Sequence, residues 1–278
     1  MMVTAFAEGA HAGDEAALPI GGERRATGPL WELGIGATAL HLADYRGSDQ
    51  SRTYVLPFPY AVYRGDWLRA DRDGARALLM RSDRIKLDVS VAATVPTDSQ
   101  DNIARSGMPD LPPTLEIGPN LNVALAASSD RRLRLELRLP LRPAFTLERS
   151  PHGIGYTFSP NLNLDIDGVA GGWHLGLLGG PIYANRRYHS HFYAVDPAFA
   201  TAARPAYSAP GGYAGWRALA ATSRSFGGAW IGAFVRYDSI AGAVFDASPL
   251  VRRIHDVTAG IGLAWVFAAS GRQVALDD

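Results

Sequence analysis

Leucine occupies every second position between Leu133 and Leu141 in the segment RRLRLELRLPLRPAF, residues 131–145. The positions between these leucines carry arginine, glutamate or proline. In a helix, side chains spaced by two would spread around the whole circumference, whereas in a strand they lie on one face. The segment is therefore predicted to be a strand with one apolar and one charged face. Such a strand is typical of a half-buried soluble sheet and equally of a β-barrel that crosses a bilayer.

The same alternation recurs from one end of the chain to the other. It is found in residues 31–39, 54–62, 85–93, 114–125, 155–166, 173–184, 212–225, 229–238 and 257–267. Many of these segments run for about 10–14 residues, whereas soluble strands average about 5–6 and a tilted membrane strand needs about 9–11. The positions between the apolar residues mix small polar residues with charges of both signs. We therefore expect the apolar lines to face lipid and the polar lines to face a crowded barrel interior.

The connections between these segments alternate in length. Long connections are expected at 96–112, 146–152, 185–211 and 239–254, and short ones near 81–83, 127–131, 168–172 and 226–228. This alternation is typical of extracellular loops and periplasmic turns. With two further crossings between residues 64 and 81, the sequence predicts an all-β fold, a closed antiparallel transmembrane β-barrel of about twelve strands. If that piece is instead a small hairpin outside the wall, about ten strands is the alternative.

Prolines fall inside several of the predicted strands. They are Pro57, Pro59, Pro119, Pro140, Pro160 and Pro181. Because proline removes one hydrogen bond of the ladder, it belongs at sheet edges or bulges, and a closed barrel has no edges. We therefore expect bulges or strand ends at these positions.

The two ends of the chain differ from the predicted barrel, residues 29–268. Residues 1–28 contain a short apolar piece and an Ala-x-Ala site at residues 10–12, but they lack the basic start and the long apolar core of a secretory signal. They are expected to be either a truncated signal peptide or a disordered linker. Residues 269–278 are expected to form a C-terminal tail.

Composition argues against several classes of function. The formal net charge is +0 and the pI is about 7.1, so no basic surface for nucleic acid is expected. Cysteine is absent, which excludes disulfides, thiol chemistry and cysteine-based zinc sites. The sequence contains no Walker or dinucleotide-binding glycine motif and no Gly-x-Ser-x-Gly elbow. We therefore predict no catalytic residue, no cofactor and no metal site.

Two small groups of polar residues are the strongest candidates for a metal or catalytic site. His189 and His191 have a ligand-like spacing with Asp196 nearby, but a metal site needs a third ligand and supporting hydrogen bonds. If extended, the pair would project to one face, and a histidine pair in an extracellular loop is the favoured interpretation. Ser48 and Asp49 lie together in RGSDQS, and turn closure by their side chains is favoured over a hydrolase site.

Charged residues on the polar lines form the main candidate site. The set comprises Glu32, Lys86, Asp88, Glu116, Arg134, Glu136, Arg138, Arg142 and Asp165. One interpretation is a network of ion pairs that fills and stiffens the interior. The other is a narrow, water-filled pore whose ion selectivity is set by these charges.

Several stretches resemble the MltA-interacting protein (MipA/OmpV) family. They include DYRGSDQSRTYVLPFPYAVYRGD (residues 44–66), RPAYSAPGGYAG (residues 204–215) and GAVFDASPLV (residues 242–251). The resemblance covers about residues 31–267, nearly the whole chain. Its most distinctive pieces are one loop and one short segment, made of Asp44, Tyr45, Arg46, Gly47 and Ser48, and of Ser248, Pro249 and Leu250.

The resemblance implies a β-barrel in the outer membrane of a Gram-negative bacterium. The founding member is described as a scaffold that links a peptidoglycan lytic transglycosylase to a bifunctional penicillin-binding protein. The family has no agreed catalytic residues, so none is carried over. Family barrels usually end in an aromatic residue that the barrel-assembly machinery reads. Here Phe267 takes that place, with Ile261, Leu263 and Trp265 on the same face, but residues 268–278 follow it, so the signal is either internal or absent.

Two hypotheses for the function follow. The first is a non-enzymatic outer-membrane scaffold in cell-wall assembly, with a lytic transglycosylase and a penicillin-binding protein as partners. It depends on the resemblance and on the lack of a catalytic constellation. The second is an outer-membrane channel or solute-responsive barrel with a charged lumen, and it depends on the polar interior. A lipid-modifying enzyme is a distant third. In each case the bilayer and the barrel-assembly machinery are expected partners, and nucleic acid is not.

Overall fold

The computed structural model of the protein describes residues 27–64, 68–71, 74–77, 80–82, 84–130, 132–226 and 228–275. The predicted signal peptide or linker lies outside this range, except for its last two residues. Antiparallel strands make up most of the described chain and form two sheets. The smaller sheet joins β1 (Thr27–Pro29) to β16 (Gln273–Ala275), so segments near the two ends of the chain pair with each other.

The larger sheet is 14-stranded. Its strands are β2 (Trp31–Ala43), β3 (Ser51–Arg64), β4 (Leu68–Asp71), β5 (Gly74–Ala77), β6 (Met80–Arg81), β7 (Ile85–Ala93), β8 (Thr114–Ala127), β9 (Leu133–Thr146), β10 (Gly153–Phe158), β11 (Asn161–Val169), β12 (Trp173–Ala184), β13 (Gly212–Phe226), β14 (Ala229–Ser239) and β15 (His255–Ala269). They follow the order β5-β4-β3-β2-β15-β14-β13-β12-β10-β9-β8-β7-β6, and β11 pairs with both β12 and β9. The chain therefore meanders, with its first long strand paired to its last.

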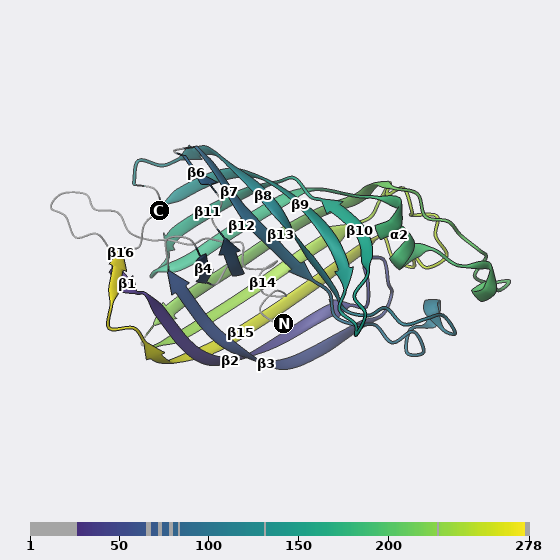
Figure 1. The fold of residues 1–278 in the computed structure, drawn as a ribbon, viewed down its shortest axis with the longest axis horizontal. Helices are drawn as coiled ribbons and strands as arrows, with labels where there is room; N and C mark the ends of the chain where they lie inside the picture. The colour runs from purple at the N-terminus through teal and green to yellow at the C-terminus, as the bar shows by residue number, and fades with distance from the viewer. Residues whose placement is uncertain are drawn as a thin grey trace.

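Figure 1 shows this sheet wrapped into a barrel-shaped wall whose strands are inclined to the long axis. β5, at one end of the sheet order, lies against β7, near the other end. An all-β antiparallel fold is thus confirmed. Closure of the barrel and the number of crossings stay predictions, because no ladder between described residues joins the two ends of the order.

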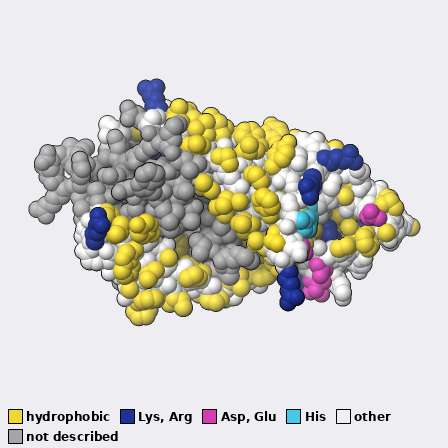
Figure 2. Space-filling model, viewed as in Figure 1, with side chains coloured by type: hydrophobic (Ala, Val, Ile, Leu, Met, Phe, Trp, Pro, Cys, Tyr) yellow, Lys and Arg dark blue, Asp and Glu magenta, His cyan; other side chains and the backbone are white. Residues whose placement is uncertain are grey.

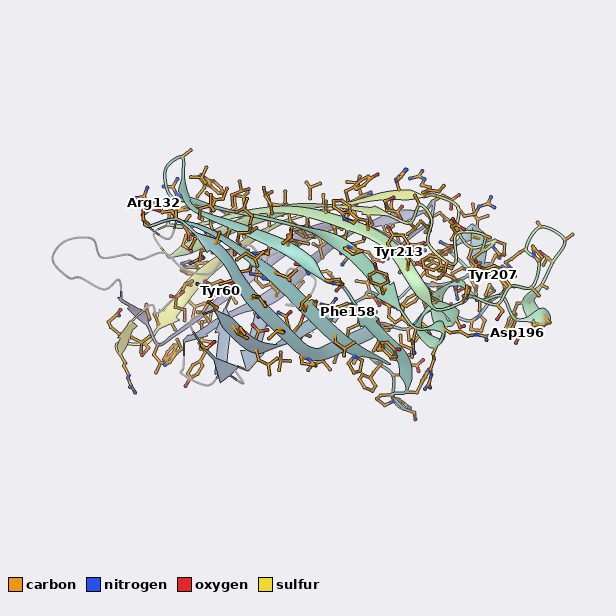
Figure 3. All side chains as sticks on the ribbon, turned by 90° about the horizontal axis from the view of Figure 1, so that it is seen from above. Tyr60, Arg132, Phe158, Asp196, Tyr207 and Tyr213 are labelled. Atoms are coloured by element: carbon orange, nitrogen blue, oxygen red, sulfur yellow. The ribbon has the colours of Figure 1, made fainter. Side chains whose placement is uncertain are left out.

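The two ends of the wall differ. Short turns follow β8, β11 and β13 at one end, here called the turn end, where the β1–β16 sheet also lies (Figure 1). The connections at the other end form the loop cap, defined as residues 44–50, 94–113, 147–152, 185–211 and 240–254. The cap contains α2 (Arg186–Tyr193) and the 3-10 helices η1 (Ile103–Arg105) and η2 (Pro197–Phe199). Figure 3 places Arg132 at the turn end and Asp196 and Tyr207 at the opposite end. No helix of the described segments is long and apolar enough to cross a membrane.

The strands alternate between an outer and an inner face. On β9, Leu133 and Leu141 are 39% and 44% exposed on the outer face, whereas Arg142 on the inner face is 7% exposed. Neighbouring strands also expose apolar side chains, and Figure 2 shows them as yellow patches along the middle of the molecule. An exposed apolar surface of this extent is unfavourable in water and is typical of a wall that faces hydrocarbon.

One set of alternating apolar residues faces the barrel interior, although it is predicted to face lipid. Residues 54–62 were expected at the lipid face, but Phe58, Tyr60 and Val62 point inward and are 9%, 7% and 2% exposed. Val55, on the other face of β3, is 73% exposed. The expectation is wrong because a period of two separates two faces without identifying the inner one. Next to β3 the interior of this barrel is itself apolar.

Four of the six prolines, Pro119, Pro140, Pro160 and Pro181, lie between the start of β8 and the end of β12, where bulges or strand ends are expected at each of them. Pro160 falls between β10 and β11, and the register of β12 with β13 shifts after Pro181, so the expectation is confirmed at both. Pro119 and Pro140 lie inside continuous strands without a register shift, and there the expectation is wrong.

Pro57 and Pro59 also lie inside a continuous strand, β3, whose register with β2 does not shift, so the expectation is wrong there as well. Over residues 51–62, β3 pairs with β2, and its described ladder to β4 contains only Tyr63 and Arg64. The prolines therefore lie on a strand with one side outside the described ladders, which is a position that proline tolerates.

The loop cap has a hydrophobic core of its own. Tyr193 stacks on Phe245 with ring centroids 3.7 Å apart. Both are buried together with Tyr45, Leu111 and Leu250. Side chains at the ends of the wall strands join the same core, so the cap packs onto the rim of the barrel. The long connections are therefore ordered structure.

Arg105, which is buried, and Arg204, which is half-buried, link connections of the cap. Arg105 is 3% exposed and donates to the carbonyl oxygens of Phe192 at 3.2 Å and Pro109 at 3.0 Å. Arg204 donates to the carbonyl oxygen of Ala104 at 3.0 Å. These bonds join the connection that follows β7 to the connection that follows β12.

Arginine substitutions at two depths in the membrane test whether the leucine face of β9 contacts lipid. Leu137→Arg is expected to lower the free energy of unfolding from lipid vesicles by about 2–4 kcal/mol, the cost of arginine near mid-membrane. The matched control is Leu133→Arg, on the same face beside the turn end, with an expected cost of about 0–1 kcal/mol. Denaturant titration measures both, and equal costs would contradict a lipid-facing wall.

Substitution of Asn102 tests whether side-chain hydrogen bonds stabilise the loop cap. Its buried amide donates to Asp44 Oδ2 at 2.8 Å and to Ser48 Oγ at 3.1 Å. Asn102→Ala is expected to destabilise this part of the cap by about 1–3 kcal/mol and so to speed tryptic cleavage after Arg105. The exposed Gln100 supplies the control, because Gln100→Ala should leave the cleavage rate unchanged. Cleavage equally slow in both variants would show that these two bonds do not hold the cap.

Candidate functional site

The two distinctive motif segments meet in the loop cap. Tyr45 Oη donates to the carbonyl oxygen of Leu250 at 2.8 Å, across 205 residues of sequence. The amide of Arg252 donates to the carbonyl oxygen of Gly47 at 2.7 Å. Gly47 has φ +92°, a left-handed conformation that favours glycine. Burial raises the pKa of Tyr45 to about 12, so its hydroxyl keeps the proton that it donates.

Both segments also bind Tyr193 at the C-terminal end of α2. The Tyr193 hydroxyl donates to the carbonyl oxygen of Arg46 at 3.0 Å, and Ser248 Oγ donates to the carbonyl oxygen of Tyr193 at 2.7 Å. Pro249 links Ser248 to Leu250, whose side chain is fully buried in the core of the cap. The motif residues therefore form a junction of three connections.

Asp44 and Ser48 close the turn of the first motif segment. The amide of Asp44 donates to the carbonyl oxygen of Gln50 at 3.0 Å, and the amide of Gln50 donates to Ser48 Oγ at 3.1 Å. Arg52 Nε donates to Asp44 Oδ1 at 3.1 Å. The bond at Ser48 agrees with the turn-closing interpretation of that side chain. Asp49, the other residue of that interpretation, has its Oδ2 4.0 Å from Arg252 Nε.

Three arginines converge on Asp238 on the inner face of β14. Arg46 Nε and Arg217 Nε each lie 3.0 Å from Asp238 Oδ1, and Arg236 Nε lies 2.8 Å from Oδ2. Asp238 is 2% exposed. The sequence analysis did not identify this cluster. Arg217, Arg236 and Asp238 lie on polar lines of β13 and β14, and the strand register sets Arg217 opposite Asp238. Arg46 lies in the loop cap, so the fold of the cap is also needed to bring the four residues together.

Glu116 and Arg142, two of the predicted interior charges, form a second buried centre. Arg142 Nε donates to Glu116 Oε2 at 3.1 Å, and Thr157 Oγ1 donates to the same oxygen at 2.9 Å. Tyr188 of α2 donates its hydroxyl proton to Glu116 Oε1 at 2.7 Å. The loop cap is therefore bonded directly to a charge on the inner wall.

Further predicted charges pair on the inner faces of β7, β9 and β11. Arg138 Nη2 lies 3.1 Å from Glu136 Oε2 and 3.5 Å from Asp165 Oδ2. Lys86 Nζ lies 3.6 Å from Asp88 Oδ2. These pairs lie between the Glu116 centre and the turn end.

Arg134 and Glu32 complete the predicted set. Arg134 Nη2 lies 3.2 Å from Asp167 Oδ2, and Asp167 also pairs with His174 of β12. Glu32 is half-buried on the inner side of β2. The structure thus brings most of the predicted charges together along one side of the interior.

The other side of the interior is apolar. Side chains of β2, β3, β12, β13, β14 and β15 form one cluster that includes Leu40, Phe58, Tyr60, Val62, Leu219, Trp230 and Phe234. Glycines on the inner face leave room for these rings. A Cβ atom at Gly36 would overlap the ring of Phe58, and one at Gly232 would lie 2.5 Å from the ring of Trp230. Ion pairs line the side formed by β7, β8, β9 and β11, whereas the other side carries rings together with the Asp238 cluster.

A cavity of about 150 Å³ lies where both sides meet the loop cap. Its charged lining consists of Asp44, Glu116, Arg46, Arg142, Arg217 and Arg236. Its apolar lining includes Leu42, Ile182, Phe192, Phe234 and Phe245. A second cavity of about 50 Å³ adjoins it, and the two share Arg142, Ser159, Ile182 and Arg217.

The histidine pair lies on α2, inside the long connection 185–211, so its backbone is helical and not extended. Asn185 caps this helix by accepting from the amide of Tyr188 at 3.1 Å, a signal that the sequence analysis missed. His189 is fully buried, with Nδ1 2.7 Å from the carbonyl oxygen of Pro210. Burial lowers the pKa of His191 to about 4. The described chain holds no group of three His, Asp or Glu side chains that could bind a metal ion.

The residues of the predicted assembly signal all point outward from β15. Ile261, Leu263, Trp265 and Phe267 are 49%, 56%, 64% and 60% exposed. β15 pairs with β14 on one side and with β2 on the other. The four side chains therefore belong to the outer apolar surface, and their role in assembly stays a prediction.

The family model described as MltA-interacting protein MipA matches residues 35–267. Among solved structures, the chain is similar to a bacterial polysaccharide outer membrane secretin, with 10% identity, a TM-score of 0.42 and coverage of 86% of this chain and 99% of that one. It is also similar to an outer membrane channel from Pseudomonas putida F1, with 11% identity, a TM-score of 0.40 and coverage of 92% and 98%. The Ralstonia pickettii toluene transporter TbuX shares 10% identity, with a TM-score of 0.25 and coverage of 87% and 70%. No curated protein matches the sequence.

The solved structures are too distant to bear on what the chain does. The family match, in contrast, includes nearly the whole 14-stranded sheet and both motif segments of the loop cap. Together with the apolar outer face of that sheet, it marks the chain as an outer-membrane β-barrel protein. The chain belongs to the family of the MltA-interacting protein MipA.

Proposed function

We propose that this protein is a non-enzymatic outer-membrane scaffold. In this role it links a peptidoglycan lytic transglycosylase to a bifunctional penicillin-binding protein during cell-wall assembly. The observation that carries the proposal is the family match over residues 35–267, since the name of that family describes a protein that interacts with the transglycosylase MltA. No cofactor takes part in this function.

The proposed setting is the outer membrane of a Gram-negative bacterium. In it the chain forms a closed barrel of about twelve crossings. The outward apolar side chains support a hydrocarbon layer around the middle of that barrel. Short turns lie in the periplasm and long loops outside the cell in such barrels. The barrel-assembly machinery would read the outward face of β15, formed by Ile261, Leu263, Trp265 and Phe267.

This orientation assigns the enzyme-binding surface to the turn end. Peptidoglycan enzymes work in the periplasm, so the loop cap is out of their reach. The turn after β8, with Ser128, Asp130 and Arg132, and the paired β1 and β16 lie at the reachable end. These segments are the proposed contact region for the transglycosylase.

The filled interior favours a rigid scaffold rather than an open pore. Ion pairs such as Arg142 with Glu116 and Arg138 with Asp165 occupy one side, and rings such as Phe58 and Trp230 occupy the other. The loop cap packs over the outer end. A wall that is stabilised by these ion pairs and ring contacts keeps a constant shape while partners bind to its periplasmic end.

A channel or solute-responsive barrel is the second candidate. It is favoured by the strip of charges along the inner faces of β7, β8, β9 and β11 and by the two adjoining cavities beside it. Rings of charge set ion selectivity in pores. In this candidate, movement of the loop cap would open the strip to water.

Retention of a purified lytic transglycosylase on the barrel tests the scaffold. Vesicles that expose the turn end should retain the enzyme, and vesicles that expose the loop cap should not, because the contact region is periplasmic. An unrelated outer-membrane barrel in the same vesicles is the control. Equal retention by the control, or no retention in either orientation, would contradict the scaffold.

Planar-bilayer recordings separate the two candidates. The scaffold predicts inserted, folded barrels without stable single-channel steps, because ion pairs and rings occupy both sides of the described interior and the loop cap packs over its outer end. Steady steps whose ion selectivity changes in Arg138→Gln would favour the channel instead.

A further inference from the structure

We infer that the outer rim of the wall, where the loop cap begins, binds the phosphate of a membrane lipid through Arg252 and Arg253. The inference rests on the proposed outer-membrane setting, with the loop cap outside the cell. It concerns the end opposite to the proposed enzyme-binding surface. The occupant is a phosphorylated lipid of the outer leaflet, whose phosphate contacts the arginines while its acyl chains lie on the apolar wall.

A belt of exposed aromatic side chains marks the end of the apolar surface on the side of the cap. Its members lie near the cap ends of β9, β10, β12, β13 and β14 and have exposed fractions from 39% to 51%; they are Phe145, Tyr156, Tyr183, Trp216 and Tyr237. Tyr237 Oη lies 2.8 Å from Nδ1 of the exposed His255, and the two rings stack with centroids 5.7 Å apart. Amphipathic rings of this kind collect where hydrocarbon meets lipid headgroups. Lipid phosphates are therefore expected just beyond this belt.

Arg252 and Arg253 lie just beyond the belt. They come shortly before β15, whose outward line begins with His255 and Val257. The backbone amides of both arginines donate to the carbonyl oxygen of Gly47, at 2.7 Å and 3.0 Å. The backbone that carries the two side chains is therefore held against the first motif segment at the rim.

The side chains of both arginines are accessible to a ligand. Both residues are exposed, and the Arg252 side chain is 52% exposed. Arg252 Nε lies 4.0 Å from Asp49 Oδ2, and a guanidinium group carries five N–H donors. Asp256, close by in sequence, is buried and accepts from the amide of Gly47 at 2.6 Å. Exposed donors therefore remain available at the rim.

The exposed carboxylate of the same connection lies farther out in the cap. It belongs to Asp246, which is close enough to Tyr207 for its charge to act on that hydroxyl group. Figure 3 shows Tyr207 in the outer part of the cap, farther from the wall than Tyr213. Three other exposed carboxylates belong to the connection that follows β7, namely Asp98, Asp101 and Asp110. An anionic headgroup beside the wall therefore meets the positive charge of the two arginines.

The rim offers partners for both parts of a phosphorylated lipid. The planar fork of arginine matches two phosphate oxygens at once. Next to the arginines, Ile254 and Val257 are 49% and 56% exposed, and Val235 on the neighbouring β14 is 53% exposed. These side chains supply the apolar surface that an acyl chain covers. A free phosphate ion would use only the arginines, so the combination favours a lipid as the occupant.

Fluorescence anisotropy of labelled lipid A, titrated with the full chain refolded in detergent, tests the inference. Saturable binding is expected. Dephosphorylated lipid A with the same label keeps the acyl chains and is expected to bind at least about tenfold more weakly, because the contacts with both arginines are lost. Sodium phosphate should displace lipid A no more than sodium chloride does at equal ionic strength. Equal binding of the two lipids, or stronger displacement by phosphate than by chloride, would overturn the inference.

Two double variants locate the site. Arg252→Gln combined with Arg253→Gln is expected to weaken lipid A binding at least about tenfold. The matched control combines Arg84→Gln with Arg272→Gln, which removes the same charge from exposed positions at the turn end. It should change binding less than about twofold, because charges this far away are screened. Equal weakening by both double variants would overturn the location.

If the rim double variant does not fold, Arg252→Gln alone carries the same test, with an expected weakening of about fivefold. No transglycosylase is present in these titrations. Failure of lipid binding would therefore leave the scaffold proposal intact, and loss of enzyme retention would leave the lipid site intact.

Discussion

Backbone amides and carbonyls that lie within hydrocarbon must find their partners inside the protein, and the rest of this structure depends on that constraint. The antiparallel ladders running from β3 through β2, β15 and β9 to β7 satisfy it for the strands between these two, and closure of the barrel would satisfy it at the outer sides of β3 and β7. Once the strands are paired, successive side chains must point to opposite sides of the wall. The leucines of β9 and the aromatic residues of β15 then meet the outer environment, while Arg142 and Asp238 are held inside. The register of the same ladders decides which of the inner charges become partners.

The interior and the loop cap form one connected structure. Tyr188 of α2 binds Glu116 on the wall, and Arg46 of the first motif segment binds Asp238. Tyr193 joins both motif segments from the middle of the cap. The family motif is therefore where the outer connections are bonded to the charged interior. This arrangement explains how long connections stay ordered at the rim of a barrel, and it creates the cavity between the cap and the wall.

The sequence was enough to predict an all-β antiparallel fold, the alternation of long and short connections, and the inner position of most charges, because each of these depends on a period of two and on turn chemistry. It failed for β3, where aromatic residues alternate as in a lipid-facing strand but point inward. It also missed α2, whose Asn185 cap is a local signal, and the cluster at Asp238. That cluster joins Arg46, Arg217 and Arg236 from three separate segments, and only the strand register and the fold of the cap bring them together.

The central claim is that the chain spans a membrane as a stable β-barrel, with an apolar outer face and a packed interior. Migration on a denaturing gel, compared between unheated and boiled samples of detergent-extracted protein, tests it most directly. A barrel whose ladders resist detergent should run at a different position before boiling and shift to the unfolded position afterwards. Protein that stays soluble without detergent and migrates identically in both samples would contradict the claim.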